Sequence, residues 1–427
     1  MATAAAATVL ASGASSSAQR QVTLRTAMPG AVFPLMAAKE GANTLKALPA
    51  ARTLVELIMP DPATGKLNLS GVGLVTKETN AVHLLAKGAT LDQYADGHQH
   101  WKATLSAALE WKSQLLNVPN HFTNTFRWIN SAGDGAPGIY VDVFGETAIA
   151  TCPSEAARYH IYPHVSDMAA TKSWNCYVGD SLQELTDAKV GFTSDGIRYE
   201  DNWAWSRYHT ATRQMREVWF NAVNRLMQAN DSRYRNQPHV LDLATDCGTF
   251  SAIASTEGAR TLTAALDVAH SENLKKQKWA LVAQQKTDKL KEVAAAQASF
   301  KEEENPFWQC TGSGHMKIVR SLPPRYFPLV SIQFDGNNIG EQEAAATDEN
   351  SLLFQTLGRV ANNGLLFVSC VDHGTKVASW LHKAVAASRR DVRVVRRIGP
   401  GGDFTVSPES THHTRTYFEG VVLQVGA

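Results

Sequence analysis

Hydrophobic and polar positions along the C-terminal half of the chain alternate between strand-like and helix-like patterns. The short apolar run Val240 to Leu243 suits a buried strand, Gly248 permits a sharp turn, and Ser251 to Ala259 has a helical pattern. Further strands are expected at 261–266, 327–334, 364–370 and 417–425, and helices at 352–360 and 377–388. This alternation predicts an α/β fold with a doubly wound parallel sheet and an antiparallel last strand.

The N-terminal half has shorter apolar runs, which turn residues separate. Strands are expected at 53–58, 71–75 and 82–85, with turn residues at 61–65, and this spacing predicts a small β domain. From Trp101 onward, apolar residues recur at helical spacing, so an amphipathic helix follows. The residues of its apolar stripe are Trp101, Leu105, Ala108, Leu109, Leu115 and Leu116.

A central segment combines turn signals with strands and a helix. Glycines and one proline crowd the stretch 126–145, between two strand-like runs, and a hairpin is expected at 190–200. A helix is expected at 211–228, and it carries Arg213, Arg216 and Arg225. The predicted organisation is therefore a leader (1–20), a small β domain (21–95), a central α+β domain (96–230) and a Rossmann-like domain (231–427).

Composition limits the classes of protein that fit. With 427 residues, of which 44% are hydrophobic, the chain can bury more than one core, and two or three domains are expected. A net charge of +1 gives no global electrostatic argument for nucleic acid, so any RNA affinity must come from local patches. The five cysteines include no C-x-x-C pair, which argues against zinc and against a disulfide framework, and no metal site is predicted. No apolar run is long enough for a membrane span.

The first residues resemble an organelle-targeting sequence. Met1 to Gln19 has no charged side chain, and the first acidic residue, Glu40, follows Arg20, Arg25 and Lys39. Serine-rich leaders that carry arginine and lack acids are typical of transit peptides, so a mitochondrial or other organelle matrix is expected. The alternative is a low-complexity tail on a cytoplasmic protein.

A candidate nucleotide site follows the strand at Val240. Asp267 ends the next apolar run, about twenty residues beyond the turn, where a Rossmann-like fold places the carboxylate that binds a ribose. An ordinary crossover with a solvated aspartate would give the same spacing. Beyond it, a lysine-rich stretch could contact phosphate, although a solvated helix of mixed charge is the alternative. Its candidate RNA-binding residues are Lys275, Lys276 and Lys278.

One motif points to a family. The stretch 127–142 resembles the bacterial large-subunit rRNA cytosine-C5 methyltransferases that carry an N-terminal PUA domain, whose hairpin reads Asn-x-x-x-Asp-Gly-x-Pro-Gly-x-x-x-Asp. The matching residues are Asn130, Asp134, Gly135, Pro137, Gly138 and Asp142. The resemblance covers nearly the whole chain after the leader, including a PUA glycine turn at Gly71–Gly73 and the Ser-Cys strand end at Ser369-Cys370.

The resemblance implies a PUA-like β domain, a central RNA-binding domain and a class I methyltransferase domain that binds S-adenosylmethionine. It further implies residue roles that this chemistry requires. Asp242, Gly248 and Asp267 would bind the cofactor, whereas Cys370 would be the nucleophile and Asp335 would lie near the target base. RNA would contact the basic residues Arg213, Arg216, Arg225, Lys275, Lys276 and Lys278.

Several family positions are altered in one pocket. Thr249 replaces the second glycine of the first turn, where its β-branch is expected to crowd the cofactor. No carboxylate stands at 309–314, where the family has the acid for adenine, and Gln333 to Asn337 replaces the rigid Asp-Pro-Pro. Near 206–216 a family glycine and aspartate are also missing, and Cys370 has the alternative of a buried core cysteine.

Two hypotheses remain. The first is a methyltransferase-fold protein of rRNA or ribosome biogenesis or structure, which binds rRNA or a ribosomal particle, with protein partners in a large assembly, and has lost methyl transfer. The second is an active rRNA (cytosine-C5) methyltransferase that uses S-adenosylmethionine. Neither hypothesis predicts DNA or membrane insertion, and the fold alone does not decide whether the chain is an enzyme.

Overall fold

The structure of this chain is a computed structural model with two compact units. Unit 1 comprises Met1–Pro119, Phe126–Asp187 and Gly402–Thr414, and unit 2 comprises Asn120–Thr125, Ala188–Gly401 and Arg415–Ala427. The structure describes residues 7–9, 21–24, 32–34, 49–50, 53–60, 64, 66–77, 81–94, 97–179, 184–185, 188–194, 196–202, 239–245, 248–256, 259–265, 308–311, 315–335, 351–371, 377–399, 401–405 and 418–426. The boundaries expected at 20, 95 and 230 stay predictions.

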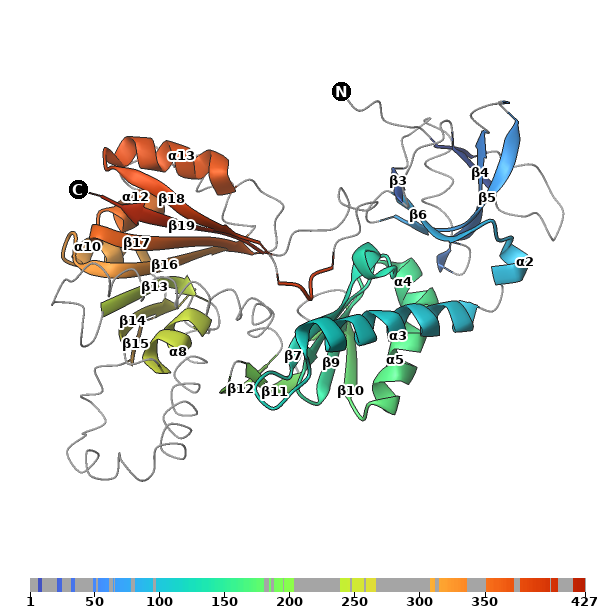
Figure 1. The fold of residues 1–427 in the computed structure, drawn as a ribbon, viewed down its shortest axis with the longest axis horizontal. Coiled ribbons are helices and arrows are strands. Elements are labelled where there is room, and N and C mark those ends of the chain that lie inside the picture. The colour runs from blue at the N-terminus through green and yellow to red at the C-terminus, as the bar shows by residue number, and fades with distance from the viewer. Residues whose placement is uncertain are drawn as a thin grey trace. The chain divides into compact units, whose positions relative to one another are not determined.

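Unit 1 begins with a β-sheet, as the short strand patterns predicted (Figure 1). In pairing order, its described strands are β1 (Ala7–Val9), β2 (Gln21–Leu24), β4 (Leu54–Pro60), β5 (Leu67–Thr76), β6 (Ala81–Lys87) and β3 (Val32–Pro34). Gly71 and Gly73 lie inside β5, so the expectation of a glycine turn here was wrong. Gly71 has φ +145°, and a Cβ there would lie 1.9 Å from the carbonyl oxygen of Ala86. The glycines instead permit a close strand crossing where the β5–β6 register shifts.

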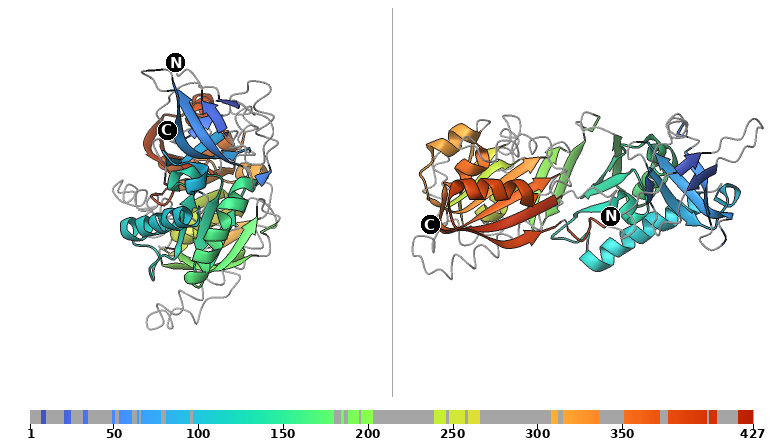
Figure 2. Two further views of the ribbon diagram at one scale, coloured as in Figure 1. Left: turned by 90° about the vertical axis from the view of Figure 1, so that its right-hand side faces the viewer. Right: turned by 90° about the horizontal axis from the view of Figure 1, so that it is seen from above.

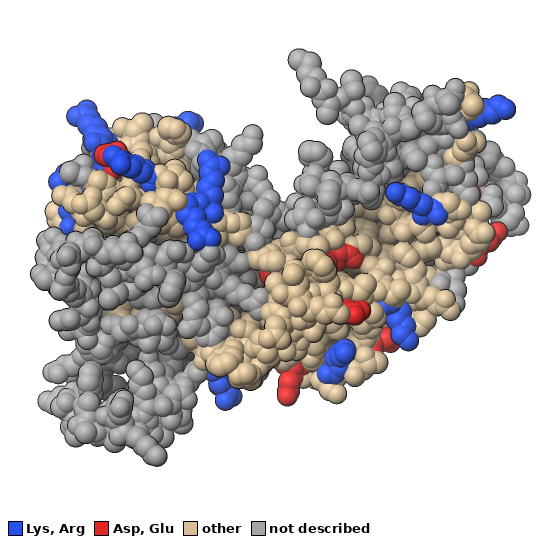
Figure 3. Space-filling model, in the orientation of Figure 1, with Lys and Arg blue, Asp and Glu red and all other residues tan. Residues whose placement is uncertain are grey.

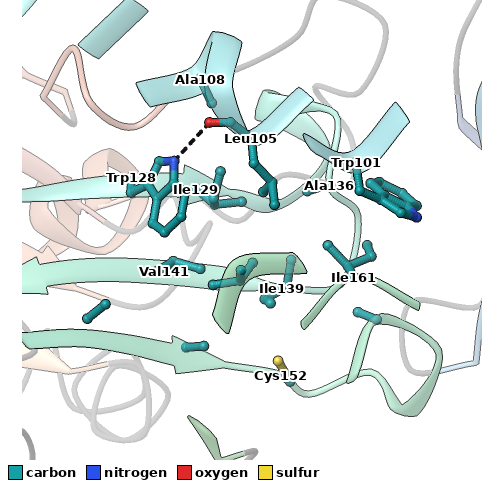
Figure 4. Close-up of a cluster of buried hydrophobic side chains, with 14 of the residues drawn as sticks. Trp101, Leu105, Ala108, Trp128, Ile129, Ala136, Ile139, Val141, Cys152 and Ile161 are labelled. Atoms are coloured by element: carbon teal, nitrogen blue, oxygen red, sulfur yellow. Dashed lines mark hydrogen bonds between the residues drawn. The ribbon is translucent and has the colours of Figure 1, made fainter. Parts of the chain in front are cut away.

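The rest of unit 1 packs helices against a second sheet. The helices are α2 (Leu91–Tyr94), α3 (Gly97–Leu116), α4 (Glu155–His160) and α5 (Tyr162–Thr171), and the strands pair in the order β10 (Asn175–Gly179), β9 (Thr147–Thr151), β8 (Tyr140–Phe144), β7 (Thr125–Asn130). The predicted stripe of α3 buries Trp101, Leu105 and Ala108, whereas Leu115 is exposed. Trp128 of β7 donates a hydrogen bond from its indole Nε1 to the Leu105 carbonyl oxygen, 3.1 Å away (Figure 4). The stripe is therefore core, and Trp128 of β7 anchors the helix to the sheet.

Unit 2 contains the expected hairpin, β11 (Lys189–Ser194) and β12 (Ile197–Asn202), and one large sheet. The described strands of the sheet pair in the order β15 (Trp308–Thr311), β14 (Arg260–Ala265), β13 (His239–Thr245), β16 (Phe327–Asp335), β17 (Val360–Val371), β19 (Phe418–Val425), β18 (Val392–Ile398). The pairs from β15 to β17 are parallel, and β19 is antiparallel to both β17 and β18. This confirms the predicted doubly wound sheet with an antiparallel last strand.

Helices cover both faces of this sheet. On one face, α10 (His315–Ser321), α12 (Leu352–Leu357) and α13 (Val377–Ser388) share a core with Leu241, Ile332 and Val368. Figure 2 shows α13 lying against the antiparallel end of the sheet. On the other face, α8 (Thr249–Thr256) places the ring of Phe250 6.2 Å from the ring of Phe367. Because alternate residues of each strand face opposite sides, the strand segment 327–334 contributes residues to both faces of the sheet.

Some predicted elements differ or lie elsewhere. Helix α12 ends at Leu357, and β17 already begins at Val360, so the end of the predicted helix 352–360 belongs to a strand. The strands β15 and β18 were not predicted, because one is short and the other is rich in arginine. The helix expected at 211–228 lies outside the described residues. Within the part of the chain that the structure describes, no helix combines the length and hydropathy that a membrane crossing requires.

Candidate functional site

The carboxyl edge of the unit 2 sheet has the predicted strand–turn–helix. After β13, Gly248 adopts φ +64°, and α8 begins at the next residue, with the Ala252 N–H donating to the Gly248 carbonyl oxygen at 2.8 Å. The left-handed conformation costs a residue with a Cβ about 1–2 kcal/mol, so glycine is favoured here. The turn is therefore built as the sequence predicted.

Asp242 supports this turn from inside the sheet. Its carboxylate is buried, and Oδ2 accepts hydrogen bonds from the Ser251 backbone N–H (3.2 Å) and the Ser251 hydroxyl (2.8 Å). Because that hydroxyl has one hydrogen, the 2.7 Å contact between Ser251 Oγ and Thr263 Oγ1 is a bond that Thr263 donates. A carboxylate at the first turn of a helix also favours the helix dipole. Asp242 thus ties β13 and β14 to α8, while its predicted role in binding a cofactor stays a prediction.

Thr249 occupies the first position of α8. It is buried, and it is not among the described residues with positive φ. The backbone at this position therefore does not require glycine, and the protein encloses the threonine side chain. The expectation that Thr249 would crowd a cofactor stays a prediction about the bound state.

The two candidate catalytic residues lie at the ends of neighbouring strands. In the parallel pairing of β16 with β17, Gln333 lies opposite Ser369, Phe334 opposite Cys370 and Asp335 opposite Val371. On its other side, Cys370 pairs with Glu419 of β19. The backbones of Asp335 and Cys370 are thus one register position apart, whereas their side chains lie outside the described residues.

A row of small polar residues on the α8 face of the sheet was missed from the sequence. Ser369 is fully buried, and within the described part of the chain its hydroxyl has no hydrogen-bond partner. Its neighbours in the row lie two residues apart on their strands, which is the spacing of one sheet face. They are Thr261, Thr263, Ser331 and Gln333. Such polar positions at every second place in otherwise apolar strands were the signal that could have revealed the row.

The other predicted site residues fall on unplaced parts of the chain. Asp267 and the six basic residues Arg213, Arg216, Arg225, Lys275, Lys276 and Lys278 lie outside the described residues. The side chains at 309–314 do as well. The structure therefore brings together Asp242, Gly248 and the strand ends that carry Asp335 and Cys370.

The hairpin that carries the family motif lies in unit 1 and is closed by buried charges. Asp134 ends a short 3-10 turn, η2 (Ser131–Asp134), and its carboxylate lies 2.8 Å from the Lys112 ammonium and accepts a hydrogen bond from the Asn130 N–H. The Lys112 Nζ also donates to the Trp128 carbonyl oxygen, at 3.2 Å. Burial lowers the pKa of Lys112, and the nearby Asp134 opposes that shift. Gly135 and Gly138 follow with φ +73° and +81°.

A second buried ion pair joins the hairpin to a distant segment of unit 1. Arg127 Nη2 and Nε donate to the Asp142 carboxylate, at 2.7 and 2.9 Å. The Asp403 carboxylate accepts the Arg127 backbone N–H at 2.9 Å, and the Phe404 ring lies 4.7 Å from the Arg127 guanidinium carbon. The Asn130 amide donates to the Thr405 carbonyl oxygen. The motif residues Asn130, Asp134 and Asp142 therefore hold the fold of unit 1 together.

The comparisons with known proteins identify the fold. Neither the protein-family models nor the curated proteins include a significant match. Among solved structures, SMU.776, named as a methyltransferase and complexed with SAH, is 14% identical, with a TM-score of 0.60 over 89% of this chain and 92% of its own. A protein from Streptococcus mutans, named as a SAM-dependent methyltransferase, is 14% identical, with a TM-score of 0.59 over 87% of this chain and 91% of its own. The chain therefore has the fold of SAM-dependent methyltransferases, a Rossmann-like class I domain with an additional β domain.

Proposed function

We propose that this chain is a methyltransferase-fold protein that binds RNA or a ribosomal particle, in rRNA or ribosome biogenesis or structure, and that it has lost methyl transfer. The observation that carries the proposal is the pairing of β16 with β17 through Asp335 and Val371. In the family that the sequence resembles, Asp-Pro-Pro makes a rigid turn at this place. Proline has no N–H to donate to the hydrogen bonds between central strands, so a strand with that motif must leave the sheet there.

In this chain the strand does not leave the sheet. Residues 333–335 of β16 stay in register with β17. The strand therefore remains paired at the place where the family has a turn beside the methyl group and the base. Cys370 has strand partners on both sides, which favours its interpretation as a core cysteine over a nucleophile at a strand end. A loss of the reaction with retention of the fold accounts for both observations.

The RNA part of the proposal rests on the hairpin motif. Its residues form an intact network in unit 1, which supports retention of the domain that reads RNA in the resembled family. The PUA-like role of the β domain belongs to the same proposal. We propose an organelle matrix, the mitochondrion in the first place, on the composition of the leader, with the cytoplasm as the alternative.

An active rRNA (cytosine-C5) methyltransferase is the second candidate, and the Gly248 turn favours it. The described part of the site fits S-adenosylmethionine, because φ +64° at Gly248 leaves a backbone without a Cβ at the tip of β13. Gly248 would admit the cofactor, and Asp267 would accept hydrogen bonds from its ribose. When bound, the cofactor would supply an electrophilic methyl group.

A calorimetric titration with S-adenosylmethionine, paired with an RNA-binding measurement, tests the proposal. We expect the purified chain to bind rRNA and to show no binding of the cofactor that depends on Asp267. Micromolar binding that disappears in Asp267→Ala would favour the enzyme and contradict the loss of function. Absence of RNA binding by the wild-type chain would contradict the RNA part of the proposal.

A further inference from the structure

Strand β18 presents an unpaired, arginine-rich edge in unit 2. It is the last strand of the seven-stranded order, so within the described residues only one of its sides is paired, to β19. Between 389 and 397 the sequence has five arginines and a single acidic residue, Asp391. Arg389, Arg393, Arg396 and Arg397 are exposed, and so is Val394, at 57%. Figure 3 shows basic side chains gathered over α13 and β18 with little acidic surface among them.

A register shift places two of these arginines on one face. Arg393 lies opposite Gln424 and Arg396 opposite Val422, and the pairing shifts between Val394 and Arg396. Because Gln424 and Val422 are two residues apart on β19, they share a face of the sheet, and so do the arginines opposite them. In a regular strand, residues three apart would face opposite sides. The bulge thus aligns Arg393 and Arg396, opposite partners that lie about 7 Å apart along β19.

The fifth arginine has a separate, structural task. Arg390 Nη1 donates to the carbonyl oxygens of Leu357 and Val360, both at 2.7 Å, and its Nε donates to Gly426, at 3.1 Å. Burial lowers the pKa of Arg390, and the nearby Arg325 lowers it further. Arg390 thus joins α12 and β17 to Gly426, and it does not belong to the exposed arginines.

The acidic residue within this segment, Asp391, neutralises little of the charge of Arg393. Asp391 lies 3.3 Å from Arg393, but the side chains are 65% and 76% exposed, and ion pairs this exposed contribute little. Charged residues also protect edge strands against pairing with other chains, and one or two charges would suffice for that. Four exposed arginines in nine positions, with two aligned by a bulge, exceed that need. The planar guanidinium fork binds phosphate in a bidentate manner, so the aligned pair Arg393 and Arg396 fits neighbouring phosphates of a linear chain.

We propose that Arg393 and Arg396, flanked by Arg389 and Arg397, bind the phosphate backbone of RNA. The inference rests on the proposed function, because it assigns a surface to the RNA binding proposed above. The contacts carry no sequence information, so this edge would contribute affinity and orientation while other parts of the chain select the RNA. Pairing of this edge with a second copy is opposed by the repulsion between like charges.

The test is fluorescence anisotropy with a labelled single-stranded RNA fragment of rRNA, repeated over a series of salt concentrations. We expect Arg393→Glu/Arg396→Glu to weaken binding about tenfold or more, and the milder Arg393→Gln/Arg396→Gln to lower the salt slope by about 1.4, which corresponds to two lost phosphate contacts. The matched control is Lys102→Glu/Lys172→Glu, two exposed lysines of unit 1 with the same change in charge. It should retain the wild-type affinity within about twofold.

The outcomes separate this inference from the proposed function. If the wild type binds no RNA, the proposed function fails. If the wild type binds RNA and the glutamine variant, with an unchanged melting temperature, keeps both affinity and salt slope, the inference fails and the function stands. Binding to vesicles that contain phosphatidylserine, lost in the arginine variants while RNA affinity is unchanged, would assign the edge to a membrane surface and overturn the inference.

Discussion

The hairpin of unit 1 and the carboxyl edge of the sheet in unit 2 differ in how their buried polar groups are hydrogen-bonded. At the hairpin, Lys112 of α3 forms an ion pair with Asp134, and Arg127 forms one with Asp142. Both ion pairs are buried. At the sheet edge, Asp242 is similarly bonded to Ser251, but the buried hydroxyl of Ser369 has no partner within the described residues. The charged groups at the hairpin are thus paired within unit 1, whereas the edge keeps a hydroxyl without a described partner.

This difference sets the motif that holds unit 1 together apart from a sheet edge with a hydroxyl that has no described partner. Buried polar atoms are nearly always bonded, and within the described residues the exceptions include Ser369 at the sheet edge and Tyr94 and Thr405 in unit 1. The retained motif residues are the ones that stabilise unit 1, and the altered family positions are those that the resemblance assigns to the cofactor and the base. Selection for stability alone is sufficient to preserve the first group.

The largest expected effect is in the hairpin. Asp134→Ala leaves the ammonium of Lys112 buried without its carboxylate, and we expect a loss of about 3–5 kcal/mol in the free energy of unfolding. The measurement is denaturant unfolding of the full chain, with hydrogen exchange followed by peptide to assign the loss to unit 1. The matched control, Lys112→Met/Asp134→Leu, removes both charges and should cost clearly less. Equal stability of Asp134→Ala and wild type would show that the hairpin network is not structural.

A smaller loss is expected from Gly138→Ala. Gly138 has φ +81°, and a Cβ there would lie 2.6 Å from the Ser154 Cβ, so strain and overpacking together should cost about 2–4 kcal/mol. Gly191→Ala is the control, because an added Cβ at this exposed glycine meets nothing within 4 Å. The control should change stability by less than about 0.5 kcal/mol. Similar unfolding midpoints for both variants would contradict the packing at Gly138.

Ser251 of α8 and Ser369 of β17 lie on the same side of the unit 2 sheet and should respond differently to substitution. Ser251→Ala removes hydrogen bonds to the buried Asp242 and from Thr263, which should cost about 1–3 kcal/mol. Ser369→Ala removes a hydroxyl without a described partner and should be neutral or slightly stabilising. Thermal unfolding of both variants gives the comparison. A large loss in Ser369→Ala would mean that this hydroxyl is satisfied within the protein, and the contrast between the two regions would disappear.

The smallest effect concerns Tyr94 in unit 1, whose buried hydroxyl has no hydrogen-bond partner among the described residues. Burial raises the pKa of Tyr94 far above its ordinary value of 10.0. Above pH 10 the unfolded chain therefore loses this proton while the folded chain keeps it, and the folded state loses stability by up to about 1.4 kcal/mol per pH unit. Tyr94→Phe should remove this dependence and match wild type at neutral pH. Unfolding midpoints between pH 9 and 11 measure it, with Tyr177→Phe, at an exposed tyrosine, as the control.

The sequence predicted the architecture well because its signals are local. The apolar run at Val240, the turn at Gly248 and the apolar stripe of α3 all form as expected. Lys112 was unpredictable, because a lysine on a helix is normally solvated and its burial depends on Asp134 in a later turn. The link between Arg127 and Asp403 joins residues 276 positions apart, a separation that no local pattern encodes.

The candidate site was predicted only in outline. The motif residues of the hairpin were recognised by spacing, but spacing does not tell a structural carboxylate such as Asp142 from one that faces RNA. The extension of β16 to Asp335 depends on pairing with β17, and the arginine edge of β18 depends on which strand ends the sheet. Both are properties of tertiary arrangement, which the order of residues does not reveal by itself.

The most direct test of the central claim is transfer of a labelled methyl group from S-adenosylmethionine to RNA. The wild-type chain and Cys370→Ala are incubated with naked rRNA and with ribosomal particles, and the label in RNA is counted. We expect the same background incorporation for both proteins on both substrates, alongside RNA binding by the wild type. Incorporation by the wild type that Cys370→Ala abolishes would contradict the account and establish this chain as a working methyltransferase.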